Sequence, residues 1–309
     1  LNHNHKIVIV QCTKIQDYSR SFKYSVIIEI GNTFSSDNIT PIDLDSLERV
    51  QILKLTRHDV VMDKPLPKTM RSLRLEYDKS LHSLPENNLQ IVEILWCSSF
   101  ESLINMNHIG RVLLEGLDIN SLSELHSGFN RVVKVKRCQK VTDFHYLSGC
   151  KSVEVVDCLL FTDTSVLRNV ENLYFELATS GMEGSNVTIL SLEGVTEIEL
   201  SMFMDLSLLQ TATRLKTVRI SEVEFMTTFD TRKVQILRTL FTLPCLQKVI
   251  ILNSGSCDTN AEITVLLEEF DYHRELYEKS IVFLRGSNKS QALEMMEVDK
   301  EEEYILVQR

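Results

Sequence analysis

Residues 134–158, KVKRCQKVTDFHYLSGCKSVEVVDC, bring three cysteines and one histidine into a short stretch: Cys138, His145, Cys150 and Cys158. Side chains of these types can ligate zinc, but zinc-binding segments usually carry close pairs such as CxxC or HxxxH, and this stretch has neither. Cys138 and Cys158 are instead 20 positions apart, and the apolar residues around them recur at the same spacing. The spacing therefore indicates a repeated structural unit rather than a metal site.

A pair of apolar residues separated by one position recurs along nearly the whole chain. Most steps between successive pairs are close to the spacing of Cys138 and Cys158, and three steps are longer. A random position pair is apolar with a chance of roughly 0.2 at this composition, so a long run in one register indicates internal repeats. The twelve pairs are Val8/Val10, Ile28/Ile30, Leu53/Leu55, Leu73/Leu75, Val92/Ile94, Val112/Leu114, Val133/Val135, Val153/Val155, Leu173/Phe175, Ile198/Leu200, Val218/Ile220 and Val249/Ile251.

Each pair has further apolar or cysteine positions at fixed distances. One lies three residues before the pair, as at Val50 and Met70, and another lies about three residues after it, as at Cys97 and Cys138. The resulting unit, L-x-x-L-x-L-x-x-C/N, resembles the leucine-rich repeat over about residues 6–285. The cysteine-containing stretch that opens this section also resembles the short leucine-rich repeats of protozoan parasite proteins.

The resemblance implies a fold of the α/β class: a leucine-rich repeat solenoid with a curved parallel β-sheet on its concave face. The convex side is expected to be mostly irregular or 3-10, with helices near the C-terminus. Because a single unit cannot bury its apolar edge alone, stacked units share one continuous core. Cys138 and Cys158 then turn inward at equivalent places in adjacent repeats, about 5 Å apart. We expect buried thiols there, with a disulfide as the remaining alternative.

Two regions are expected along the chain. Residues 1–285 form the solenoid of about 12 repeats, and residues 286–309 form an acidic C-terminal cap or tail. Helical spacing of apolar residues predicts helices in residues 231–244 and 260–280, within the longer final repeats. A last strand is expected at SIVFL, residues 280–284. The segment NSGSCDTN, residues 253–260, predicts a loop that carries the most exposed cysteine, Cys257.

The positions that point away from the core form exposed columns on the expected concave face. Trp96, the only tryptophan, lies in the column that follows each pair by two residues, beside Tyr77 and Arg57. These three residue types are enriched in interface hot spots. The alternative is that Trp96 packs against the edge of its own repeat. The residues expected to bind a partner are Arg57, Arg74, Tyr77, Trp96, Lys134, Arg137, Glu154, Asp157 and Tyr174.

Charge is also sorted along the repeats. A basic patch surrounds the fifth to seventh strands, and an acidic stretch follows it. A face of two signs can orient a protein partner, although a solvated surface of mixed sign is the alternative. The basic residues are Arg131, Lys134, Lys136, Arg137, Lys140 and Lys151, and the acidic ones are Glu154, Asp157, Glu171, Glu176, Glu197 and Glu199.

Composition limits the classes of function. A net charge of -10 disfavours nucleic acid and anionic membranes as partners. No apolar run approaches the roughly 20 residues that a membrane span needs. GxxxxGK[ST], GxGxxG, GxSxG and HExxH are all missing, so we expect no enzymatic activity, no cofactor and no metal. Seven cysteines, an odd number, favour a reducing compartment and hence the cytoplasm.

The sequence therefore predicts a non-enzymatic scaffold that binds a protein partner on the concave face, as a subunit of a larger assembly. The alternative is a substrate-recognition subunit of a ubiquitin ligase, because the cysteine-containing repeats resemble those of F-box proteins. The sequence shows no F-box helices ahead of the repeats, and its period is about 20 rather than about 26 residues. An extracellular receptor-like domain is a third class, but cysteine-rich caps are missing.

Overall fold

The structure is a computed structural model of the chain. It describes residues 6–10, 26–31, 47–57, 62, 64–125, 131–176, 191–200, 209–221, 243–253 and 280–285. The chain divides into two compact units. The first contains residues 1–161 and 169–171, and the second contains residues 162–168 and 172–309.

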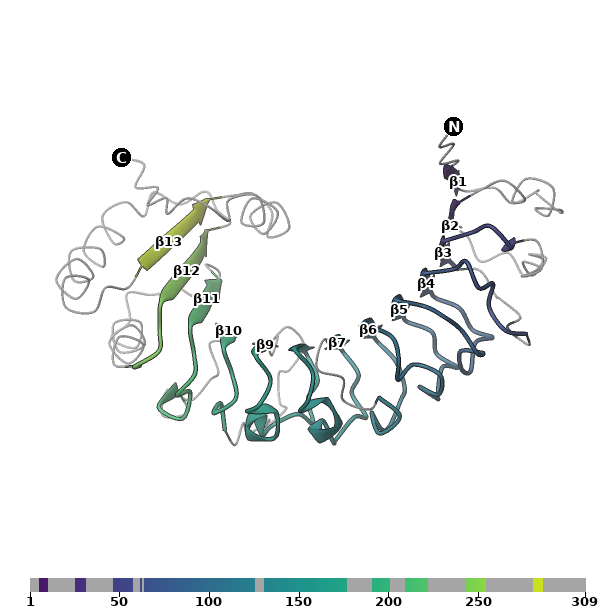
Figure 1. The fold of residues 1–309 in the computed structure, drawn as a ribbon. Helices are drawn as coiled ribbons and strands as arrows, with labels where there is room; N and C mark the ends of the chain where they lie inside the picture. The colour runs from purple at the N-terminus through teal and green to yellow at the C-terminus, as the bar shows by residue number, and fades with distance from the viewer. Residues whose placement is uncertain are drawn as a thin grey trace. The chain divides into compact units, whose positions relative to one another are not determined.

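The first unit is a parallel solenoid whose described strands pair in chain order, one strand per repeat (Figure 1). The apolar pairs of neighbouring repeats lie opposite one another, as Leu73 does to Val92 and Leu75 to Ile94. The strands are β1 (Lys6–Val10), β2 (Ile27–Gly31), β3 (Ile52–Thr56), β4 (Ser72–Glu76), β5 (Ile91–Leu95), β6 (Arg111–Glu115), β7 (Val132–Lys136) and β8 (Ser152–Val156).

Burial alternates along these strands because successive side chains point to opposite faces of a sheet. In β7, Val133 and Val135 are buried, whereas Lys134 and Lys136 are partly exposed. β-Branched and aliphatic residues at the buried positions suit an extended backbone and pack tightly against the next repeat. From β2 to β8 each repeat thus contributes its apolar pair to one core, as the period predicted.

The segments that return from one strand to the next complete the core. They are mostly irregular, and the described ones include two 3-10 helices, η2 (His145–Leu147) and η3 (Thr164–Leu167), of which η3 belongs to the second unit. Phe144, which precedes η2, is buried and packs on Phe161 with ring centroids 4.4 Å apart. Repeats as short as these leave room only for such turns, which agrees with the predicted return segments.

The second unit is also built on parallel strands: β9 (Asn172–Glu176), β10 (Glu197–Leu200), β11 (Thr217–Ser221), β12 (Lys248–Asn253) and β13 (Ser280–Arg285). β13 confirms the strand predicted at SIVFL. The order of pairing within the unit follows the chain from β9 to β13.

Two strands depart from the predicted register. In β1 the residues opposite Ile28 and Ile30 are Ile7 and Ile9, so the predicted pair Val8/Val10 is one position out, and Val8 is exposed. In β10, Ile198 lies opposite Phe175 rather than Leu173. One difference lies at the start of the repeats and the other follows a step longer than the common period, and at both places the period alone does not fix the alignment.

Several predictions concern residues outside the described ones. They are the helices at residues 231–244 and 260–280, the loop with Cys257, and the tail at residues 286–309. The predicted boundary at residue 285 therefore stays a prediction. Among the described residues, no helix combines the length and apolar character that crossing a bilayer would require.

Candidate functional site

The residue after each central strand of the first unit adopts a left-handed backbone conformation. Values of φ lie between 51° and 63° at all of these positions. An L-residue with a side chain pays about 1–2 kcal/mol for this conformation, so most proteins reserve it for glycine. We call these positions, one per repeat from β3 to β8, the ladder: Arg57, Tyr77, Trp96, Gly116, Arg137 and Asp157.

A repeated hydrogen bond accounts for this conformation. The backbone N–H of each ladder residue from Arg57 to Arg137 donates to the carbonyl of the last strand residue in the next repeat. The N···O distance is 2.7 Å from Trp96 to Glu115 and 2.9 Å from Gly116 to Lys136. The turn is therefore part of the contact between repeats, and it projects each ladder side chain outward at the end of its strand.

The residue that follows the ladder turns inward and explains the cysteine spacing. Cys97, Cys138 and Cys158 are free thiols with no exposed surface. Each Sγ lies within hydrogen-bonding reach of the carbonyl two residues before it, at 3.4 to 3.5 Å. Burial raises the pKa of Cys97 and Cys158 to about 12 and that of Cys138 to about 11, from an ordinary value of 9.0.

These thiols therefore hold a proton at neutral pH. The described residues contain no group of three or more His, Cys, Asp or Glu side chains placed to hold a metal ion. In the repeat of β4 the same inward position is taken by Asp78, whose Oδ1 accepts hydrogen bonds from the backbone N–H of Ser80 and Leu81. Leu117 takes this position in the repeat of β6, so from β4 to β8 the residue after the ladder is buried whether it is polar, a thiol or aliphatic.

Side chains of the ladder stack on one another from repeat to repeat. The Arg57 guanidinium lies 5.3 Å from the centroid of the Tyr77 ring. The Tyr77 and Trp96 rings are 6.5 Å apart and inclined by only 13°. The Arg137 guanidinium lies 5.8 Å from the Trp96 ring. Cation–π and ring–ring contacts of this kind hold large side chains in place at a surface.

Gly116 provides the space for the Trp96 ring. A Cβ at Gly116 would come within 2.2 Å of a carbon of that ring, so no other residue fits here without moving the tryptophan. Trp96 is half-buried and rests on the next repeat, while Tyr77 beside it keeps 40% of its surface exposed. The alternative that Trp96 packs on the edge of its own repeat does not describe this contact.

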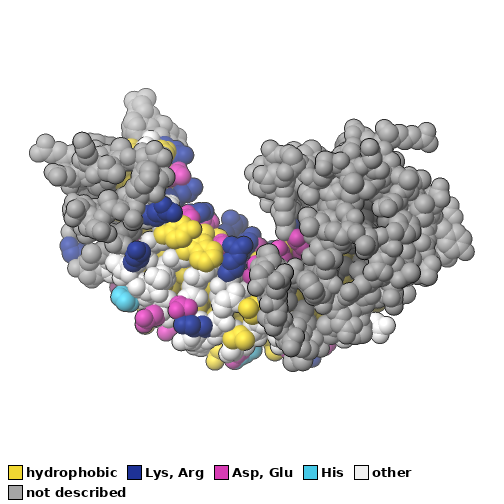
Figure 2. Space-filling model, turned by 180° about the vertical axis from the view of Figure 1, so that it is seen from behind, with side chains coloured by type: hydrophobic (Ala, Val, Ile, Leu, Met, Phe, Trp, Pro, Cys, Tyr) yellow, Lys and Arg dark blue, Asp and Glu magenta, His cyan; other side chains and the backbone are white. Residues whose placement is uncertain are grey.

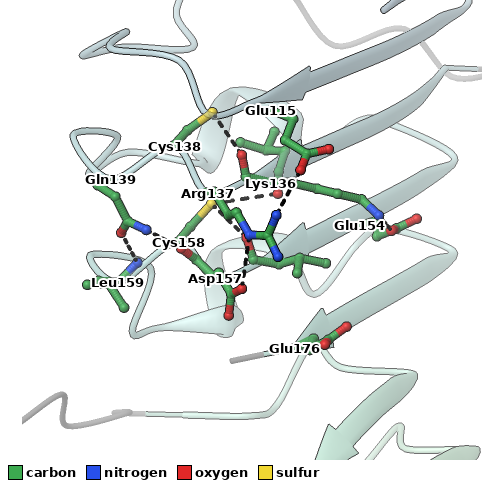
Figure 3. A network of polar contacts seen from close by, with 12 residues as sticks. Glu115, Lys136, Arg137, Cys138, Gln139, Glu154, Asp157, Cys158, Leu159 and Glu176 are labelled. Atoms are coloured by element: carbon green, nitrogen blue, oxygen red, sulfur yellow. Dashed lines mark hydrogen bonds and ion pairs between the residues drawn. The ribbon is translucent and has the colours of Figure 1, made fainter. Parts of the chain in front are cut away.

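The charged end of the ladder is a network of ion pairs (Figure 3). Arg137 contacts Glu115 at 3.1 Å and Asp157 at 3.5 Å. Glu154 lies 2.6 Å from the Nζ atoms of both Lys134 and Lys136. Burial alone would raise the pKa of Glu154, but hydrogen bonds from the two lysines and their charges outweigh it, and the pKa falls below 4.5.

The network changes the predicted charge pattern. Lys134, Lys136 and Arg137, three members of the expected basic patch, are each paired with a less exposed carboxylate, so the patch is not made of basic side chains alone. Lys140 pairs with Asp118 at 2.8 Å. Arg131 is buried, and its guanidinium donates to the carbonyl of Met106, so placing it on the surface was wrong.

Eight of the nine predicted partner-binding residues belong to the first unit. Five of them lie on the ladder, and three occupy outward positions on strands β4, β7 and β8. Arg74 on β4 contacts Glu93 at 3.1 Å and Glu76 at 3.2 Å. The structure therefore groups these residues on one run of neighbouring repeats, with Lys134 and Glu154 paired beside the ladder.

Tyr174 belongs to the second unit and has its own surroundings. Its hydroxyl lies 2.7 Å from Glu176 and 3.2 Å from Glu199, and the Arg219 guanidinium lies 5.5 Å from its ring. Burial and the two nearby carboxylates raise the pKa of Tyr174. The phenol therefore stays protonated and fixes these strands to one another.

Sequence reasoning missed Gly116 and Glu115 as parts of the site. Gly116 was visible in the sequence as the only glycine in a column of large and charged residues. The significance of Glu115 was not visible, because an ion pair across neighbouring strands depends on side-chain direction.

Apolar side chains lie exposed between lysines and arginines on one face of the molecule (Figure 2).

Comparison of the chain with protein-family models, with curated proteins and with solved structures gives no match.

Proposed function

We propose that this chain is a non-enzymatic, leucine-rich-repeat-type binding protein that holds a protein partner against the ladder, as a subunit of a larger assembly. The observation that carries the proposal is the stack formed by Arg57, Tyr77 and Trp96 on the outside of β3 to β5. Residues of these types dominate binding energy at protein interfaces. They are also held in position before a partner arrives, which reduces the entropy lost on binding.

The leucine-rich repeat assignment rests on two features taken together. One is the unit L-x-x-L-x-L-x-x-C/N, and the other is one parallel strand per unit with inward cysteines after it. The free thiols support a reducing compartment, so we place the protein in the cytoplasm in this proposal.

Affinity capture from cells tests the proposal. The wild type would be compared with the double variant Tyr77→Ala/Trp96→Ala, and bound proteins identified by mass spectrometry. The control is Ile104→Ala/Leu160→Ala, because these residues are also apolar and exposed (52% and 48%) but lie in the return segments. Circular dichroism confirms that all three proteins are folded.

We expect one or a few partners to be lost from the ladder variant and kept by the control. Each hot-spot residue contributes at least about 2 kcal/mol, which corresponds to roughly 30-fold in affinity. Retention of every partner by the ladder variant would refute the proposed site. A ubiquitin-ligase adaptor among the lost partners would instead favour the recognition-subunit alternative.

A further inference from the structure

We infer that the ladder binds an extended acidic segment of a partner protein, with an apolar side chain placed between its carboxylates. This inference rests on the proposed function and specifies the partner's chemistry. It follows from the order in which charges and rings are layered on strands β3 to β8.

In the ion pairs of Arg137 and Lys134, the cation is the member more exposed to solvent. The Arg137 side chain is 51% exposed, whereas its partners Glu115 and Asp157 are 18% and 14% exposed. Lys134 is 41% exposed and Glu154 only 19%. The carboxylates thus lie beneath the cations that neutralise them. A partner approaching this surface meets guanidinium and ammonium groups first.

Arg74 repeats this arrangement nearer the aromatic stack. Its side chain is 37% exposed, compared with 22% for Glu76 and 30% for Glu93. Lys54 on β3 is also exposed, close to the Arg57 end of the ladder. The outer layer of this face is therefore cationic, although the protein as a whole carries a net charge of -10. Such a surface complements carboxylates on a partner.

The centre of the ladder is aromatic and apolar. Tyr77 and Trp96 present nearly parallel rings between the two arginine ends of the ladder. Leu113, at the outward middle position of β6, adds a partly exposed aliphatic side chain on a neighbouring repeat. An aliphatic or proline side chain of the partner can pack on these rings, while the flanking arginines contact its acidic residues.

The spacing of the repeats sets the spacing of the partner's residues. Neighbouring strands are about 4.8 Å apart, so Trp96 lies roughly 10 Å and Arg137 roughly 20 Å along the sheet from Arg57. An extended chain advances about 3.3 Å per residue. An acidic residue near each arginine therefore requires a separation of about six residues, with the apolar residue halfway between them. The expected pattern is acid-x-x-apolar-x-x-acid.

Single-stranded nucleic acid is the competing ligand, because arginines and aromatic rings also bind phosphates and stack on bases. Its affinity comes largely from cations that release counterions when they meet phosphates. Here Arg74, Lys134 and Arg137 already face their own carboxylates. The face therefore favours a ligand with a few well-placed charges over one with a charge at every residue.

The test is a selection of displayed random 12-residue peptides on the immobilised wild-type protein, repeated on three variants. Arg57→Gln/Arg137→Gln removes the two charges, and Tyr77→Ala/Trp96→Ala removes the rings. Lys68→Gln/Lys151→Gln is the control, since both lysines are exposed and lie off the ladder. Enriched peptides are then titrated while the emission of Trp96, the only tryptophan, is followed.

We expect peptides with acidic residues six apart around an apolar residue to be enriched on the wild type and the control. The arginine variant should lose the acidic preference and bind these peptides at least about 10-fold more weakly. Enrichment of basic or uncharged peptides, no enrichment, or the same enrichment on the arginine variant would overturn the inference. So would displacement of the peptides by an oligothymidylate. The proposed function fails separately, if Tyr77→Ala/Trp96→Ala keeps all the cellular partners of the wild type.

Discussion

Gly116→Ala tests the contact between the aromatic stack and the repeat beneath it. The added Cβ would meet three carbons of the Trp96 ring at 2.2, 2.5 and 2.6 Å, so the ring must move away. The backbone itself can accept a side chain here, because Trp96 and Arg137 adopt nearly the same φ at 55° and 52°. The substitution therefore combines a modest backbone cost with a steric one that depends on the tryptophan.

The two costs can be estimated and separated. Alanine in the left-handed region costs about 1–2 kcal/mol. Displacing a packed ring from its position adds about 1–3 kcal/mol. Gly116→Ala should thus destabilise the wild type by about 2–5 kcal/mol, but should destabilise a Trp96→Ala background by only the backbone share. The coupling between the two sites should be about 1–3 kcal/mol.

Urea denaturation of the four proteins, followed by far-ultraviolet circular dichroism, measures this coupling. A second readout is the emission of Trp96, which should shift to longer wavelength in Gly116→Ala as the ring becomes more exposed. Equal costs in both backgrounds, to within about 0.5 kcal/mol, would show that Gly116 is required by the backbone alone. Unchanged tryptophan emission would refute the same reasoning independently.

Three further predictions concern the core and the charges. Iodoacetamide at about pH 8 should modify the exposed Cys245 of the folded protein and spare Cys158, which is buried and whose pKa of about 12 keeps it protonated. Peptide mass spectrometry measures both modifications, and equal labelling of the two cysteines would contradict the prediction. Glu154→Gln should lower the free energy of unfolding by about 1 kcal/mol at neutral pH. Denaturation curves should show this difference between variant and wild type disappear as the pH falls below 4.5 and reaches the lowered pKa of Glu154 in the folded protein. Phe144→Ala should lower the free energy of unfolding by about 3–5 kcal/mol in urea titrations, whereas the exposed Ile104→Ala should change it by less than about 0.5 kcal/mol.

Periodicity predicts the central repeats well for a physical reason. Each repeat packs almost only on its neighbours, so the residues that must be apolar recur at a fixed distance in the sequence. From β2 to β8 the predicted pairs lie opposite one another as expected. The period does not fix every strand: at β10, Ile198 aligns with Phe175 rather than Leu173, whereas β3 and β12, which also follow longer steps, keep the predicted register.

The candidate site was less predictable because it depends on contacts between side chains. The outward column was visible in the sequence, and so was the presence of Trp96 in it. What the sequence could not show is that Arg137 lies over two carboxylates or that Arg131, six residues earlier, is buried. The two-residue period of a strand determines the face on which a residue lies, but a long side chain can still fold back to a carbonyl, as Arg131 does to Met106.

The ladder separates the side chains that face outward from the residues that hold the repeats together. Its backbone conformation is fixed by a hydrogen bond from the main chain to the next repeat, which any residue except proline can make. Arginine, tyrosine, tryptophan, glycine and aspartate all occupy it in this chain, and the buried apolar pairs lie on the opposite face of the strands. Substitutions along the ladder can therefore alter rings and charges with little effect on the shared core. The exception is Gly116, where the identity of one ladder residue depends on the ring beside it, and this dependence is what the double-mutant cycle measures.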